Sequence, residues 1–198
     1  MIPRHLQIAM VVLFAAVLVL GFYVRSMRGR VGEKIRAMDS RPVAPPASGP
    51  TENATLYVAY DDPGVLRAEG TAIPLPSGRQ ERAHELAQAL LARYLGKNSP
   101  HVLPAQADLR DVYMVDPGLV VIDVNSAFAD GHRSGILIEE LTVASFAQTL
   151  ASNLPGINRV KFLVDGKQRE TLAGHADLSG FYDTGAIASL SQQLQQAP

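Results

Sequence analysis

The residues of this chain best suited to chemistry are histidines and carboxylates in its second half. His175 and Asp177 lie two residues apart in "GHADLSG", His132 lies in the glycine-rich "DGHRSG", and Asp123 interrupts the apolar run "LVVIDVN". A histidine near a carboxylate can act as a general base or ligate a metal, provided that the fold brings further partners to it. The spacing matches no nucleophile elbow, no metal-ligand motif and no complete triad. A catalytic or metal site built from these four residues is therefore a weak hypothesis, and we expect neither a metal nor a cofactor.

Structural roles explain the same residues more simply. We expect Asp177 to close a side-chain turn with Ser179, while His175 packs at the end of a sheet. The glycine-rich segment around His132 ends in Ser134 and is expected to be a loop that caps the following helix.

Two adjacent glutamates, Glu139 and Glu140, lie at the start of a predicted helix. On a helical wheel Glu140 falls among apolar residues such as Val143 and Ala147. The polar residues of this helix cluster on its other side: Thr142, Ser145, Gln148, Thr149 and Ser152. An inward carboxylate can be a catalytic acid with a raised pKa, but the first helical turn also offers free backbone amides and the positive end of the helix dipole. We predict that Glu140 is a structural acid.

The elements that position these residues alternate between strand pairs and helices. Strands are predicted at 54–60, 65–73, 109–115, 119–125, 158–164 and 169–174, and helices at 77–95 and 138–153. Ser77 and Gln80 have the spacing of a capping box at the start of the first helix. The order ββα-ββα-ββ predicts an α+β domain in which a single mixed sheet carries two helices on one face.

Strand alternation divides the apolar residues between the two faces of this sheet. The residues expected to face the helices are Leu56, Val58, Val120, Ile122, Val124, Val160, Phe162 and Val164. The opposite face carries Tyr57, Leu119, Val121 and Leu163. Two helices can cover only one side of a sheet, so these four residues form a candidate contact face.

The N-terminal part of the chain predicts a membrane anchor. Leu6 to Val24 is an apolar run in which Gln7 is the one polar residue, and as a helix it would extend roughly 28 Å, close to the thickness of a bilayer's hydrocarbon core. No small-x-small cleavage site follows it, so we expect an uncleaved span. The predicted organisation is an anchor with a basic flank at 1–36, a proline-rich linker at 37–53, a folded domain at 54–182 and a polar tail at 183–198.

Charge is distributed unevenly along the chain. Five basic residues follow the span within a dozen positions, and the positive-inside rule would place the folded domain in the cytoplasm. Residues 37–198 carry 12 basic and 18 acidic side chains, and this acidic balance argues against a nucleic-acid partner. The chain has no cysteine, which excludes thiol nucleophiles, thiolate metal sites and disulfides.

The run from "ATLYVAY" to "GHADLSG" resembles a GerMN domain, the module named after the sporulation and spore-germination protein GerM. The segments that carry the resemblance are "LYVAYDD", "ERAHELAQALLARYL", "LVVIDVNSAF", "ILIEELTVASFAQTLASNLPGINRVKFLVDGK" and "LAGHADLSG". The resemblance implies a non-enzymatic module, similar in fold to ring-building motifs, in an extracytoplasmic compartment, and it gives the Gly-His-x-Asp-Leu at the domain's end no catalytic role. GerM-like proteins often carry tandem copies and a lipid anchor, whereas this chain has one copy and an expected membrane helix.

Three functions remain open from the sequence. We favour a membrane-anchored interaction module of the cell envelope that docks onto copies of itself or onto an envelope partner. The first alternative is a cell-wall-directed hydrolase acting through Glu140, Asp123, His132 or His175. The second is a domain that binds a small ligand or a glycan. Where the charge count and the resemblance disagree on orientation, we follow the resemblance and the proline-rich stalk.

Overall fold

The computed structural model describes residues 51–116 and 118–196. Its elements are β1 (Thr51–Tyr60), β2 (Val65–Pro74), α2 (Arg79–Leu95), β3 (Leu109–Asp116), β4 (Leu119–Val124), α3 (Ser126–Asp130), α4 (Ile136–Asn153), β5 (Arg159–Val164), β6 (Tyr182–Asp183) and α5 (Thr184–Gln196). The predicted span at Leu6 to Val24 lies outside the described residues. Among the residues that are described, no helix is both long enough and apolar enough to cross a membrane.

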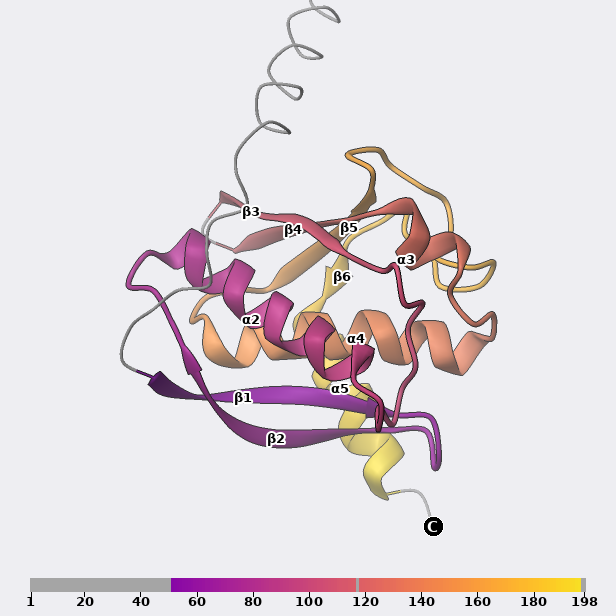
Figure 1. Ribbon diagram of the computed structural model, residues 1–198, viewed down its shortest axis with the longest axis horizontal. Helices are drawn as coiled ribbons and strands as arrows, with labels where there is room; N and C mark the ends of the chain where they lie inside the picture. The colour runs from indigo at the N-terminus through magenta and orange to yellow at the C-terminus, as the bar shows by residue number, and fades with distance from the viewer. Residues whose placement is uncertain (1–50, 117, 197–198) are drawn as a thin grey trace, which may run out of the picture. The chain divides into compact units, whose positions relative to one another are not determined.

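The strands form two sheets instead of the single sheet that we predicted. β1 and β2 pair as an antiparallel hairpin, and the other sheet has the order β3-β4-β5-β6, in which β4 and β5 are parallel. Figure 1 shows α2 and α4 lying between the two sheets. The prediction of one sheet is wrong because the second edge of β1 contacts helix side chains where a further strand was expected.

That edge of β1 is bonded by polar side chains of α4 and α2. The Asn153 side chain accepts from the Thr55 N–H (3.1 Å) and donates to the Thr55 carbonyl (2.8 Å). Thr149 Oγ1 accepts from the N–H of Tyr57 (2.9 Å). Farther along the strand, the Tyr94 hydroxyl accepts from the N–H of Ala59 (2.8 Å). The polar side of α4, which the helical wheel set apart from the inward face, is therefore buried against a strand.

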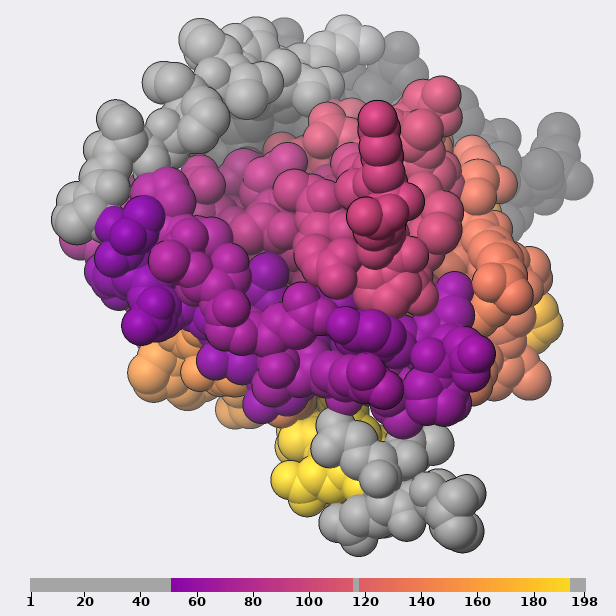
Figure 2. Space-filling model, turned by 60° about the horizontal axis from the view of Figure 1, so that its bottom comes forward, coloured from indigo at the N-terminus to yellow at the C-terminus, as the bar shows by residue number. Residues whose placement is uncertain are grey.

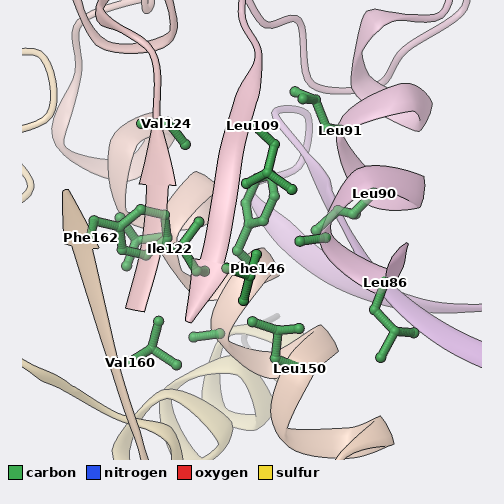
Figure 3. Close-up of a cluster of buried hydrophobic side chains, with 14 of the residues drawn as sticks. Leu86, Leu90, Leu91, Leu109, Ile122, Val124, Phe146, Leu150, Val160 and Phe162 are labelled. Atoms are coloured by element: carbon green, nitrogen blue, oxygen red, sulfur yellow. The ribbon is translucent and has the colours of Figure 1, made fainter. Parts of the chain in front are cut away.

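The core lies around α2 and α4 and is formed with residues of both sheets. Phe146 of α4 stands edge-on to Phe162 of β5, with ring centroids 6.3 Å apart, and Figure 3 shows both beside Ile122 of β4 and Leu86 and Leu90 of α2. All five are at most 1% exposed. The eight residues predicted to face the helices are all buried, which confirms the alternation along the strands.

Both predicted helices are confirmed as α2 and α4, but the capping box of α2 is wrong. The N-cap of α2 is Gly78, and no side chain caps it. Gln80 instead bonds the edge of β3: its side-chain oxygen accepts from the N–H of Met114 (2.8 Å) and its amide donates to the carbonyl of Val112. A glutamine can join a strand edge in this way because its amide carries the same donor and acceptor as a peptide group.

The last part of the domain departs most from the predictions. The strand expected at 169–174 is absent, and isolated bridges at Val164–Lys167 and Thr171–Asp177 stand in its place. β6 (Tyr182–Asp183), which lies beyond the expected strand, pairs with β5, and the predicted polar tail forms α5. Figures 1 and 2 show α5 (yellow) beside the β1–β2 hairpin (indigo to purple).

Candidate functional site

Glu139, at the start of α4, holds the loop of residues 173–176 against the helix. Its Oε2 accepts three backbone N–H bonds, each 2.9 Å long, from Ala173, His175 and Ala176. Its Oε1 accepts from the N–H of Gly135 (3.1 Å) and lies 2.8 Å from Nδ1 of His175. These bonds explain the missing strand, because the amides of this loop meet a carboxylate instead of a neighbouring strand.

The Glu139 side chain is fully buried, yet it remains ionised. Burial raises the pKa of its carboxyl, but the bonds from His175, Ala173, Ala176 and Gly135 outweigh that effect and hold the pKa at about 2. A carboxylate that accepts several backbone N–H bonds is stabilised in its charged form. At neutral pH this group is therefore a fixed acceptor and carries no proton to donate.

Glu140 does not have the position that we predicted. The inward acid is its neighbour Glu139, which is 0% exposed, whereas Glu140 is half-buried. Burial, followed by the charges of Glu139 and Asp177, raises the pKa of Glu140. The helical wheel put Glu140 on the inward side because it assumes that only the apolar side of a helix is buried. In α4 both the apolar and the polar sides are buried, so apolar neighbours do not identify a single inward face.

His175 and Asp177 lie in the same loop but act separately. Asp177 accepts the N–H of Ser179 at 2.7 Å, which confirms the predicted side-chain turn. His175 is exposed and bonds Glu139, with Ser134 Oγ 3.3 Å from the same ring nitrogen. The predicted packing of His175 at a sheet end is replaced by this contact with the start of α4.

His132 belongs to a buried chain of hydrogen bonds that the sequence analysis missed. Nε2 of His132 and Nε2 of His101 both lie 2.7 Å from Thr142 Oγ1. Nδ1 of His101 lies 2.6 Å from Asp61 Oδ1, and Nδ1 of His132 lies 2.8 Å from the carbonyl of Arg133. We call Asp61, His101, Thr142 and His132 the histidine chain.

The order Asp61–His101–Thr142 has the connectivity of a catalytic triad, but its position argues against catalysis. Thr142 and His101 are 0% exposed and His132 is 6% exposed. A nucleophilic hydroxyl must reach a substrate, and this one is enclosed by α4 and the loops before β3 and α4. No local motif could have revealed the chain, since His101 and Asp61 are isolated residues separated by 40 positions.

Asp123 lies on the face of the four-stranded sheet turned away from α2 and α4. It is 4% exposed, accepts the N–H of Gly166 (2.8 Å) and lies 3.4 Å from the Arg110 guanidinium. Burial raises the pKa of Asp123, while the bond from Gly166 and the charge of Arg110 oppose the shift. Asp123 therefore fixes the predicted turn at Asp165–Gly166, where both residues have positive φ.

The same face carries three of the four predicted contact residues. Strand register places Val121 beside Lys161 and Tyr113, and it places Leu163 beside Asp123. Leu119 precedes Val121 on the same face of β4. Tyr113, Val121 and Leu163 are half-buried, and Leu119 is 8% exposed. We call Tyr113, Leu119, Val121, Asp123, Lys161 and Leu163 the outer face.

Tyr57, the fourth predicted contact residue, lies in the other sheet, so the contact face cannot include it. Tyr57 lines a cavity of about 580 Å³ with Arg67, Gln148 and Ser191. The error follows from the assumption of a single sheet.

Phe181 borders the outer face and is 58% exposed. The Arg159 guanidinium lies 5.6 Å and the Lys161 ammonium 5.8 Å from its ring centroid. Lys161 donates to the carbonyls of Leu178 (2.5 Å) and Ser179 (2.7 Å), and burial lowers its pKa, which Asp177 opposes. The loop after β5 is thus held across one side of this face by a buried cation.

The structure does not bring the candidate residues together into one site. His175 lies with Glu139, His132 lies in the histidine chain, and Asp123 lies on the outer face. Across residues 51–116 and 118–196, no group of three or more histidine and carboxylate side chains is placed to hold a metal ion.

Comparison with known proteins supplies a family and a fold. A family model described as "Germane: Sporulation and spore germination" matches residues 55–170. The tandem GerMN domains of the sporulation protein GerM from Bacillus subtilis align with 67% of this chain at 20% identity and a TM-score of 0.50. This chain covers 46% of that tandem structure, about half of its length.

The first GerMN domain of the same Bacillus subtilis protein, solved alone, aligns with 65% of this chain and is itself 93% covered. Its identity is 20% and its TM-score 0.44. Curated protein sequences give no match.

Proposed function

Because this chain belongs to the Germane family of sporulation and spore germination domains, we propose that it is a non-enzymatic interaction module of the cell envelope. The module works by docking its outer face onto a second copy of itself or onto an envelope protein. The observation that carries the proposal is the half-buried apolar surface of Tyr113, Val121 and Leu163 on an ordered sheet, bordered by the exposed ring of Phe181. Exposed apolar area with aromatic and cationic neighbours is typical of protein contact surfaces.

The histidine and carboxylate side chains already bond within the fold, and this supports docking over hydrolysis as the function. Glu139 and Asp123 are buried and already accept backbone N–H bonds, and the imidazoles of His101 and His132 are enclosed. A hydrolase needs an acid and a base that both face a substrate. His175 is exposed, but its Nδ1 contacts Glu139, so it lacks a free carboxylate partner among the residues described.

The position in the envelope is part of the proposal. Leu6 to Val24 spans the membrane once, the proline-rich segment acts as a stalk, and the folded domain faces away from the cytoplasm. Membrane anchoring raises the effective concentration of neighbouring domains, so contacts that are weak in solution suffice at the membrane. An alkaline phosphatase fused after Pro198, which folds actively outside the cytoplasm, should be active. A well-expressed but inactive fusion would place the domain in the cytoplasm and refute this orientation.

Replacing both Val121 and Leu163 by lysine is expected to reduce docking at least about tenfold, because two ammonium groups would be desolvated in the contact at a cost exceeding roughly 1.4 kcal/mol. The measurement is the yield of crosslinked complexes in intact cells, after thermal melting has established that the double variant still unfolds cooperatively.

The matched control is Val102→Lys, which adds a lysine at a valine that is 66% exposed in the loop before β3. It should leave the crosslinking yield unchanged. A folded double variant that crosslinks as well as the unaltered chain would exclude the outer face.

A further inference from the structure

The histidine chain has one hydrogen too few when both imidazoles are neutral. Asp61, which also pairs with Arg133 at 3.3 Å, and the Arg133 carbonyl are acceptors, so the Nδ1 atom facing each of them must carry a hydrogen. Both neutral rings then present a bare Nε2 to Thr142 Oγ1, each at 2.7 Å. The Thr142 hydroxyl has one hydrogen, for which the carbonyl of Ile138 at 3.0 Å is a further acceptor, so it can satisfy at most one of the two nitrogens.

We propose that the histidine chain is a buried proton-binding site that takes up one proton shared between His101 and His132. With this proton on His101, and with the Thr142 hydrogen directed to His132 instead of to the carbonyl of Ile138 3.0 Å away, every contact of the histidine chain pairs a donor with an acceptor. His101 donates from Nδ1 to Asp61 and from Nε2 to Thr142, the Thr142 hydroxyl donates to Nε2 of His132, and His132 donates from Nδ1 to the carbonyl of Arg133. Both contacts at Thr142 Oγ1 are 2.7 Å long, within hydrogen-bond distance, and the singly protonated chain supplies a hydrogen for each of them.

The charges around the site favour one proton and oppose a second. Asp61, in the turn after β1, attracts a proton to His101, and Glu139 of α4 attracts one to His132. Arg133, in the loop before α4, repels a proton at His101. A second proton would place two cations with ring centroids 6.0 Å apart around one hydroxyl.

Burial of the two imidazoles determines the pH range in which the histidine chain binds its proton. It lowers the pKa of both His101 and His132, and for His101 the bond and charge of Asp61 oppose the shift. Tyr94 of α2 is the other titratable group packed on His101, with its ring edge-on at 4.9 Å, and it stays neutral because burial raises its pKa. The site therefore fills at a pH below the ordinary imidazole pKa of 6.5.

Proton uptake has a structural consequence because the chain joins three distant segments. The turn after β1, the loop before β3 and the loop before α4 meet at Thr142. The protonated chain holds these segments with one more hydrogen bond than the neutral chain does. The site thus makes the order of one end of the molecule depend on pH.

The test follows the imidazole nitrogen signals of the full chain by nuclear magnetic resonance from about pH 8 to about pH 4, the range in which histidines titrate. We expect His101 and His132 to shift together in one step that takes up one proton, with any second step at least about one pH unit lower.

Two variants test the role of the hydroxyl. Thr142→Val removes it with little change of shape and should abolish the common step, so that the two imidazoles titrate separately. Thr142→Ser keeps the hydroxyl and should preserve the common step. Separate titration in the unaltered chain, an absence of protonation before the fold melts, or a common step retained in Thr142→Val would each overturn the proposal. If Thr142→Val does not fold, the unaltered chain and Thr142→Ser decide the matter.

Discussion

Replacing Glu139 by alanine is expected to lower the free energy of unfolding by about 3–5 kcal/mol, the range found when one partner of a buried charged network is removed. The loss is large because three N–H groups of the 173–176 loop and that of Gly135 lose their acceptor together. Urea denaturation at neutral pH measures the effect. Glu139→Gln should recover part of it, since the amide oxygen still accepts bonds but carries no charge.

The adjacent residue provides the control. Glu140→Ala should change stability by no more than about 0.5 kcal/mol, because Glu140 is half-buried and burial already opposes its charge. An equal loss in the two variants would contradict the role assigned to Glu139.

The acid range gives an independent measure of the same residue. The pKa of Glu139 is about 2 in the folded chain against an ordinary value of 4.5, so its contribution is complete above pH 4.5 and disappears as the pH falls towards 2. A shift of this size corresponds to about 3 kcal/mol. The stability of Glu139→Ala should therefore fall less steeply than that of the unaltered chain in this range.

Tyr94→Phe is expected to lower stability by about 1–3 kcal/mol, because it leaves a buried backbone N–H without its acceptor. The Tyr94 hydroxyl accepts from Ala59 at 2.8 Å, and Tyr94 and Ala59 are 1% and 0% exposed. The phenylalanine ring fits the same space, so the variant keeps the packing and removes the hydrogen bonds of the hydroxyl, which has Ser145 as a second partner. Thermal and urea unfolding both report the change.

Tyr182→Phe removes the same atom from a tyrosine whose buried hydroxyl has no hydrogen-bond partner within residues 51–116 and 118–196. It should be neutral or stabilising, since it deletes an unsatisfied polar atom. If the two tyrosine variants lost the same stability, the bond from Ala59 to Tyr94 would not contribute as described.

Local patterns were sufficient to predict α2, α4 and most of the strands, but not α3 or α5. The apolar spacing of α2 and α4 and the alternation along β4 and β5 follow the side of each element that packs in the hydrophobic core, and this packing is reflected directly in residue type. Asp177 with Ser179 was predictable for a similar reason, because that turn needs no partner from elsewhere.

The errors about side-chain partners all concern contacts between distant segments. Gln80 was predicted to cap its own helix and instead bonds β3 more than thirty residues away. Glu140 was predicted to be the inward acid in place of Glu139, because the loop that Glu139 bonds lies more than thirty positions later in the sequence. His101 and Asp61 carried no local signal, since their partners are one another and Thr142. The chemistry of the site is determined by tertiary proximity, which a single sequence does not record.

The contact between α4 and β1 has a geometric consequence. Four residues of an α-helix rise roughly 6 Å, and two residues of a strand rise roughly 6.7 Å. Polar side chains at every fourth helical position are therefore spaced almost as far apart as alternate residues of a strand. Asn153 and Thr149 meet Thr55 and Tyr57 in this way. The offset between the helical position and its strand partner grows by roughly 0.7 Å at each repeat. At Ala59, the next position, the partner is accordingly the longer side chain of Tyr94 from α2. Polar side chains of one helix can therefore bond the edge of a strand only over a short length, and a second helix bonds the next position.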